Sequence, residues 1–458
     1  MAIPQSIHMP ELRPLMVSTF YSEFQNGGTL DKDVIKKNKK EMEISTFKIC
    51  FVSALQFIFF AECCFGNSLF DNYLESSIQN VQQENGASKI ANATNYFGFG
   101  LYNKLQGNDN VLISPYTMAS VMAMLYLGSR GITEREMSTA LGYNMLELSP
   151  DDIVLGFQQL INILNTNSND YTLKTASALL VQDSFHILDE YKQHLERNFG
   201  VEAQEVDFVN RPEKVKQAIN KWVAQKTRNN IPILLDDPLK PNTRLFFLNA
   251  VYFKGLWKSK FDSENSNVLP FFNNGITRTN VVMMYMTSEF PFAYVPNLKS
   301  FALEMPYQGN KINMLLLLPR SRTGLSELEN TLSSSSLNYI DSLLRKMEVD
   351  VLIPKFTLKE TYTNTLKRSL VDMGINHLFG HANLTGMVSE GNLYVSDVFH
   401  KTFIQVDEEG TAAAAVGGAS VVGYSASSPR FYANHPFIFF IRHAETGVVL
   451  FMGKVATL

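Results

Sequence analysis

Few residues of this chain are spaced like the groups of an enzyme's active site. The sequence has no Gly-x-Ser-x-Gly nucleophile elbow, no His-Glu-x-x-His zinc motif and no Walker phosphate loop. Gly98 and Gly100 lack the third glycine of a dinucleotide-binding turn. His377 and His381 could share a helical face as metal ligands, but no acidic or cysteine partner stands beside them. The sequence therefore predicts no enzyme, no metal site and no cofactor.

The composition is that of an ordinary globular protein. Of 458 residues, 45% are hydrophobic, 12% aromatic and 18% charged, which excludes fibrous and disordered classes. The 40 basic and 44 acidic residues give a formal charge of −4, so no global field favours nucleic acid or an anionic membrane. We expect a monomer with neither as a partner.

One segment, residues 407–428, does not fit an ordinary structural role. It is rich in Gly, Ala, Ser and Val and nearly uncharged, and strand-like sequence flanks it on both sides. Gly410, Gly417, Gly418 and Gly423 interrupt any helix that the alanines could form. A stretch of about 20 residues between two strands indicates a functional or mobile loop.

The composition of this loop also permits a second, extended state. Thr411, Ala413, Ala415 and Gly417 would line one face of a strand. All four side chains are small enough to enter an interior that is already packed.

Helical patterns precede strand patterns along the chain. Apolar residues recur at helical spacing in residues 92–105, 115–128 and 213–229. Branched and aromatic residues dominate later segments, which we expect to be strands: residues 245–253, 301–305, 313–318, 349–353, 437–441 and 448–452. This order, without regular strand–helix alternation, predicts an α+β fold with mainly antiparallel sheets.

Several stretches resemble the serpin family of serine protease inhibitors. Glu408, Glu409, Gly410, Thr411, Ala412, Ala413, Ala414 and Ala415 are similar to the hinge of that family's reactive loop. Further similar stretches follow the family's order: residues 219–223, 249–257, 303–307, 354–356, 373–375, 434–437 and 447–453. The resemblance runs from about residue 91 to residue 458.

The resemblance implies one domain of three β-sheets and about eight or nine helices, with the loop exposed at one pole. It also implies a metastable inhibitor. A protease attacks the loop as a substrate and forms an acyl-enzyme, and the freed hinge then enters the main sheet as an added strand and distorts the protease. A non-inhibitory serpin, acting as a carrier, a storage protein or a protease substrate, remains the alternative.

Family usage places the cleaved bond sixteen residues beyond the first hinge glutamate, at Tyr424 and Ser425. Tyr424 is the loop's single aromatic residue and would fill the apolar pocket of a chymotrypsin-like protease. Counting back from Asn434 shifts the bond by one residue. Arg430, suited to a trypsin-like target, is the second choice.

Four other positions match parts of the family that control opening of the sheet. Ser114, Asn249 and His400 match the shutter, whose polar side chains lie beneath the centre of the sheet. Trp257 matches the aromatic residue where the hinge first enters. Plain core packing is the alternative role for Trp257, and a buried histidine with satisfied hydrogen bonds is the alternative for His400. By contrast, the acidic residues after Gly128 give no basic helix there, so heparin activation lacks support.

The N-terminal region has the pattern of a secretory leader. All three cysteines, Cys50, Cys63 and Cys64, lie in or beside an apolar run at residues 49–61 that follows a lysine cluster. About 13 apolar residues are too few to span a bilayer; a membrane anchor or a buried helix remains the alternative to a leader.

The chain divides by these patterns into four segments. They are an upstream extension at residues 1–41, a signal peptide at 42–66, a tail at 67–90 and a single domain at 91–458. Secretion would make the sequons at Asn92 and Asn383 candidate glycosylation sites.

Overall fold

The computed structural model describes residues 67–165, 171–389, 393–411 and 428–458. Internal contacts divide the chain into Met1–Asn85 and Gly86–Leu458, and the second unit holds both sheets. No helix in the described part of the chain combines the length and apolar character that crossing a bilayer requires.

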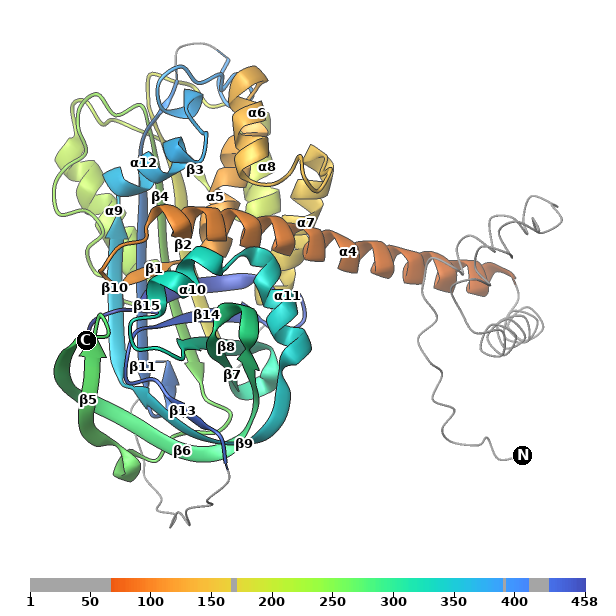
Figure 1. Ribbon diagram of the computed structural model, residues 1–458. Coiled ribbons are helices and arrows are strands. Elements are labelled where there is room, and N and C mark those ends of the chain that lie inside the picture. The colour runs from red at the N-terminus through yellow and green to blue at the C-terminus, as the bar shows by residue number, and fades with distance from the viewer. Residues whose placement is uncertain (1–66, 166–170, 390–392, 412–427) are drawn as a thin grey trace. The chain divides into compact units, whose positions relative to one another are not determined.

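Nine α-helices lie in the described residues (Figure 1). They are α4 (Asn67–Lys104), α5 (Pro115–Gly128), α6 (Gly131–Ala140), α7 (Pro150–Asn165), α8 (Asp189–Phe199), α9 (Pro212–Lys226), α10 (Leu325–Thr331), α11 (Ser334–Leu343) and α12 (Asn364–Asp372). The helical patterns predicted from residues 92, 115 and 213 are confirmed. Ser114 caps α5, since its side chain accepts a hydrogen bond from Thr117 N, and Pro115 follows at the first helical position.

A nine-stranded sheet is built mostly from the second half of the chain. It contains β1 (Val111–Ile113), β15 (Val449–Val455), β14 (Phe437–His443), β8 (Ile312–Pro319), β7 (Ser300–Pro306), β6 (Thr277–Val295), β9 (Arg345–Pro354) and β13 (Arg430–Tyr432), with β5 (Asn267–Asn273) beside β6. The 19 residues of β6 pair with β5, β7 and β9 in turn, so one continuous strand joins groups that the resemblance expects as separate sheets.

A six-stranded sheet has the order β10 (Phe356–Tyr362), β11 (Val395–Asp407), β12 (Gly410–Thr411), β4 (Leu245–Leu256), β2 (Tyr171–Gln182) and β3 (Ala203–Val206). Its neighbours are antiparallel except for two pairs, β4 with β11 and β2 with β3. The predicted α+β class with mainly antiparallel sheets is confirmed.

Both faces of the six-stranded sheet are covered, because β4 contributes alternate side chains to two hydrophobic clusters. Val251 and Phe253 belong to the larger cluster. Leu248 and Ala250 pack instead with Ile219 of α9 in the smaller one. Since side chains alternate along a strand, even-numbered β4 residues face α9 and odd-numbered ones face the main core.

Candidate functional site

The hinge predicted from the sequence enters a slot between two parallel strands. β11 pairs in parallel with β4 from Val395 to Phe403. Beyond that ladder, the two-residue strand β12 lies between the same strands and is antiparallel to both. Thr411 is opposite Val406 on one side and Gly255 on the other. The hinge therefore already occupies the first positions of a central strand.

Trp257 lies at the end of this slot where β12 begins, directly after the residues of β4 that pair with β12. Its side chain is fully buried and stacks on Tyr307, with ring centroids 4.5 Å apart and planes at 11°. Its indole Nε1 donates a hydrogen bond to Asp407 O at 3.0 Å, and its backbone N–H donates to Glu409 O at 2.8 Å. Trp257 thus contacts both the core and the hinge backbone, which is more than core packing alone requires.

Glu408 is tied to the sheet by its carboxylate and by its carbonyl. Lys355 Nζ and Ser266 Oγ donate to the carboxylate at 2.9 and 3.0 Å. Phe261 N donates to the Glu408 carbonyl at 3.0 Å. Partial burial alone would raise the pKa of Glu408, but the bonds from Lys355, the glutamate's own backbone and Ser266 outweigh burial and lower that pKa. The residue is therefore held as an anion.

The next two hinge residues are fixed by a charge and by a backbone conformation. Glu409 forms an ion pair with Lys260. Gly410 has φ +143°, and a Cβ there would lie 2.1 Å from Gly255 O. No other residue fits that position without moving β4.

The far end of the loop is anchored to β9. Ser428 Oγ donates to Glu348 at 2.8 Å, and Asp350 N donates to Pro429 O at 3.0 Å. Arg430 begins β13 and is paired opposite Asp350 in that strand. Ala412, Ala413, Ala414, Ala415, Tyr424 and Ser425 fall outside the described residues.

Ser114, Asn249 and His400, the three residues matched to the shutter, lie in contact with one another. His400 is fully buried, and Asn249 is opposite it in the β4–β11 ladder. Ser114 N donates to His400 Nε2 at 3.0 Å, so the ring proton belongs on Nδ1, which donates to Asn249 Oδ1 at 2.9 Å. Ser114 Oγ donates to Leu450 O at 2.6 Å. Burial lowers the pKa of His400 to about 3, so the ring is neutral at pH 7.

Two members of this cluster were missed by the sequence reasoning. Thr117 Oγ1 donates to Asn249 Oδ1 at 2.8 Å, and Asn249 Nδ2 donates to Ser177 Oγ at 2.9 Å. Thr117 lies three residues after Ser114 on α5, a spacing that could have indicated it. Ser177 has no local signal, because only the β2–β4 register brings it to Asn249. The cluster links α5, β2, β4 and β11, and the bond between Asn249 and His400 joins the two strands that border the slot.

Outside the hinge, the structure shows the surroundings of His377, one of the two histidines considered as metal ligands. His377 Nδ1 lies 2.6 Å from Glu136 Oε1, an acidic partner that sequence proximity did not suggest. Among the described residues, no three metal-binding side chains form a group that could hold an ion.

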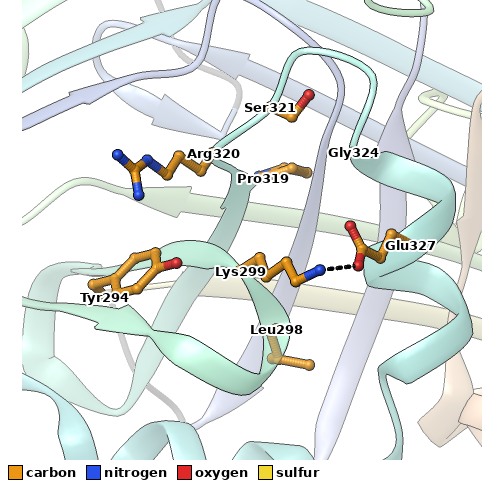
Figure 2. Close-up of a pocket in the computed structure, with 8 residues that line it drawn as sticks. All are labelled: Tyr294, Leu298, Lys299, Pro319, Arg320, Ser321, Gly324 and Glu327. Atoms are coloured by element: carbon orange, nitrogen blue, oxygen red, sulfur yellow. Dashed lines mark hydrogen bonds and ion pairs between the residues drawn. The ribbon is translucent and has the colours of Figure 1, made fainter.

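A pocket of about 410 Å³ lies apart from the hinge (Figure 2). Lys299 and Glu327 form an ion pair at 2.5 Å in its wall, and the Arg320 guanidinium points away from that pair. None of its lining residues belongs to the hinge or to the cluster beneath the slot. We assign it no part in the chemistry of the loop.

Comparisons with known proteins agree with this geometry. A family model described as "Serpin (serine protease inhibitor)" matches residues 92–458. The chain is 50% identical to "Intracellular coagulation inhibitor 1" of Tachypleus tridentatus, covering 91% of this chain and 100% of that protein. It is 38% identical to "Leukocyte elastase inhibitor" of Sus scrofa, covering 81% and 99%. Human thyroxine-binding globulin complexed with thyroxine superposes with a TM-score of 0.75 at 28% identity, covering 81% and 99%.

The comparisons contradict the prediction of secretion. The relative that matches 91% of this chain is named an intracellular inhibitor. The apolar run at residues 49–61 lies outside the described residues. A short apolar run after lysines is shared by leaders, anchors and buried helices, so the pattern was too unspecific to establish export.

The predicted glycosylation of Asn92 and Asn383 depended on secretion, so it has no support once secretion is contradicted. Asn92 and Asn383 are both exposed. Thr94 of the first sequon is buried, and Thr385 of the second donates its hydroxyl to Asn383 Oδ1 at 2.8 Å. The Thr385 hydroxyl thus has a partner within its own sequon that needs no glycan.

Proposed function

The chain belongs to the serpin family, and from that premise we propose that it inhibits a chymotrypsin-like serine protease as a suicide substrate. It is a protease inhibitor and not an enzyme. The observation that carries the proposal is the position of β12, which is paired with β4 and β11 at the end of their parallel ladder.

The register of β12 gives the path of the inserting loop. Thr411 is opposite Gly255 and Val406. If each further loop residue advances by one along both antiparallel partners, Ala413 lies between Phe253 and Ile404, and Gly417 lies between Asn249 and His400. Insertion therefore separates β4 from β11 and breaks the cluster beneath the slot at its centre.

The same register explains why the alternate residues are small. Phe253 and Ile404 belong to the main hydrophobic core, so Ala413 would point into it. Ala414 would lie between Tyr252 and Phe403 and face the side of α9. Insertion replaces one ladder with two, and each added hydrogen bond contributes about 0.5–1.5 kcal/mol. This gain in hydrogen-bonding free energy would drive insertion of the loop once the protease has cut it.

We place the cleaved bond between Tyr424 and Ser425. The protease serine attacks the Tyr424 carbonyl, the bond to the Ser425 nitrogen breaks, and that nitrogen leaves as a protonated amine. The tyrosine ring suits an apolar primary pocket, where its burial contributes about 1.5–3 kcal/mol. The pairing of Arg430 within β13 argues against the trypsin-like alternative, because cleavage there requires unpairing the strand.

Mixing the protein with chymotrypsin tests the proposal. We expect an SDS-resistant complex and a C-terminal fragment beginning at Ser425. The Tyr424→Gly variant should form that complex much more slowly, because the primary pocket stays empty. Cleavage at Ser425 without a complex would instead identify a non-inhibitory serpin, and a fragment beginning elsewhere would refute the assignment of the bond.

A further inference from the structure

The pocket shown in Figure 2 lies where three neighbouring strands begin or end. Ser300, the first residue of β7, is opposite Val295 at the end of β6 and Pro319 at the end of β8. A short turn at Pro296–Leu298 joins β6 to β7, and residues 320–324 lead from β8 into α10. The strand ends, both connections and α10 all contribute residues to the lining of this pocket of about 410 Å³. Its volume is within the usual range of small-ligand sites, about 300–1,000 Å³.

Part of the pocket wall is apolar. Leu298 and Pro319 line it and are buried. Tyr294 lines it as well, but this residue is 40% exposed. Its ring packs against Phe301, its partner in the β6–β7 ladder, with ring centroids 5.4 Å apart. The pocket thus presents an aromatic ring that is held in position and still has surface to offer to a flat ligand.

The charges that line the pocket leave one cation unmatched. Lys299 and Glu327 form an ion pair, and the hydrogen bond to Glu327 is the main cause that raises the pKa of Lys299. Arg320 donates its backbone N–H to Lys299 O at 2.9 Å. Its side chain is exposed and forms no ion pair with any described residue. Two cations and one anion therefore line the pocket, and the unmatched positive charge is that of Arg320.

The chemistry of Arg320 suits a carboxylate in particular. A guanidinium is planar and can donate to both oxygens of a carboxylate at once. We propose that the pocket binds an aromatic carboxylate, a ligand with one planar ring and one carboxyl group. Arg320 binds the carboxylate, and the ring packs on Tyr294. The ring supplies apolar surface to bury, and the charge fixes the orientation of the ligand.

The charge balance selects against other small ligands. The net positive charge repels a cation. A dianion such as a phosphate monoester needs a second unmatched cation, but Lys299 is already paired with Glu327. An aromatic carboxylate can come from two sources: a free acid of low molecular mass, or the last residue of a peptide, whose α-carboxylate has the same chemistry.

A ligand titration of the full-length protein at pH 7, followed by fluorine NMR, tests the proposal. The probes are N-acetyl-para-fluoro-L-phenylalanine, its C-terminal amide, and an N-acetylated tetrapeptide of three glycines and a final para-fluoro-L-phenylalanine with a free carboxylate. We expect the Kd of the acid to be about tenfold lower than that of the amide, which has no charge to pair with Arg320. Tighter binding of the tetrapeptide identifies a chain end as the ligand, and equal or weaker binding identifies a free acid.

Matched arginine variants locate the carboxylate. Arg320→Gln should raise the Kd of the acid about tenfold and change that of the amide less than about twofold. The control Arg322→Gln removes a neighbouring exposed arginine that does not line the pocket and lies 3.9 Å from the centre of the Phe272 ring. It should change the Kd of the acid less than about twofold.

Matched tyrosine variants locate the ring. Tyr294→Ala should weaken binding of the acid and the amide alike, because both ligands lose the same aromatic contact. The control Tyr339→Ala removes a tyrosine of α11 that is 41% exposed and does not line the pocket, and it should weaken neither. Thermal unfolding of each variant checks its fold. The proposal is wrong if the acid shows no saturable binding, if the amide binds as tightly as the acid, or if either variant has the same effect as its control.

Discussion

His400 illustrates, at the scale of one residue, how a polar side chain can hold two strands together from beneath. Its two ring nitrogens bond to Ser114 and Asn249, which come from different elements. Both bonds require the neutral ring, because Nε2 must accept while Nδ1 donates. Protonation of the ring would therefore break the cluster.

This requirement predicts a pH dependence of stability. The pKa of His400 is about 3 in the fold, against about 6.5 in the unfolded chain. Between these values only the unfolded chain binds the proton, so stability falls as the pH drops below about 6.5, by about 1.4 kcal/mol per unit. Above that pH this residue contributes no pH dependence.

Thermal unfolding between pH 7.5 and pH 5 checks this prediction. His435 and His443 also have pKa values lowered by burial, so they contribute in the same direction. The difference between the wild type and His400→Asn isolates His400, and the wild type should lose more stability on acidification. Parallel curves for the two proteins would contradict the role given to the ring.

Gly410 is a second residue whose identity the geometry dictates. In the variant Gly410→Val, the new side chain clashes with Gly255 O, so the hinge should leave the mouth of the slot and expose Trp257. The chain has two tryptophans, and Trp222→Phe removes the other signal. In that background we expect a red shift of the emission. Unchanged emission would mean that Trp257 stays covered without the hinge.

The residues predicted from the sequence were those within recognisable stretches. Ser114 precedes a helix-initiating proline, and Trp257 and Asn249 share one stretch. Lys355, Ser266 and Lys260 were missed because they hold the hinge from loops or strand ends more than 50 residues away in sequence. Ordinary lysines and serines carry no local mark of a contact that only the fold creates.

At the scale of elements, the proposed insertion depends on the pair of strands β4 and β11. They are parallel neighbours below β12, a pairing that strand patterns could not reveal because β11 lies about 150 residues after β4. The burial pattern of β4 is nearly continuous, as expected of a strand covered on both faces. The periodicity gave the strands, but their order depends on the whole chain.

The register makes a prediction about two adjacent loop residues. Ala413→Glu would place a carboxylate between Phe253 and Ile404 in the main core, at a cost of several kcal/mol. Ala414→Glu makes the same chemical change on the side of α9. We expect the first variant to become a substrate of chymotrypsin and the second to retain most complex formation.

The stoichiometry of inhibition measures both outcomes. It should rise strongly for Ala413→Glu and modestly for Ala414→Glu. Equal values would show that the loop does not follow the register set by Thr411.

At the scale of the whole molecule, the two sheets differ in how the strands that flank the loop are paired. In the nine-stranded sheet, β9 already pairs with β6 and β13. In the six-stranded sheet, the residues between β4 and β11 that the structure describes are Gly410 and Thr411 of β12. The proposed mechanism requires the loop beyond Thr411 to extend β12 along these two strands after cleavage, and the pairing gained in that step would make the intact chain metastable.

The most direct measurement compares the unfolding temperature of the intact protein with that of a sample cut once in the loop. We predict that the cut protein unfolds at a markedly higher temperature, since the freed segment adds two ladders between β4 and β11. Separation of the fragments by size exclusion under native conditions should fail for the same reason. If the cut protein unfolds at the same or a lower temperature, the loop does not insert, and the proposed mechanism is wrong.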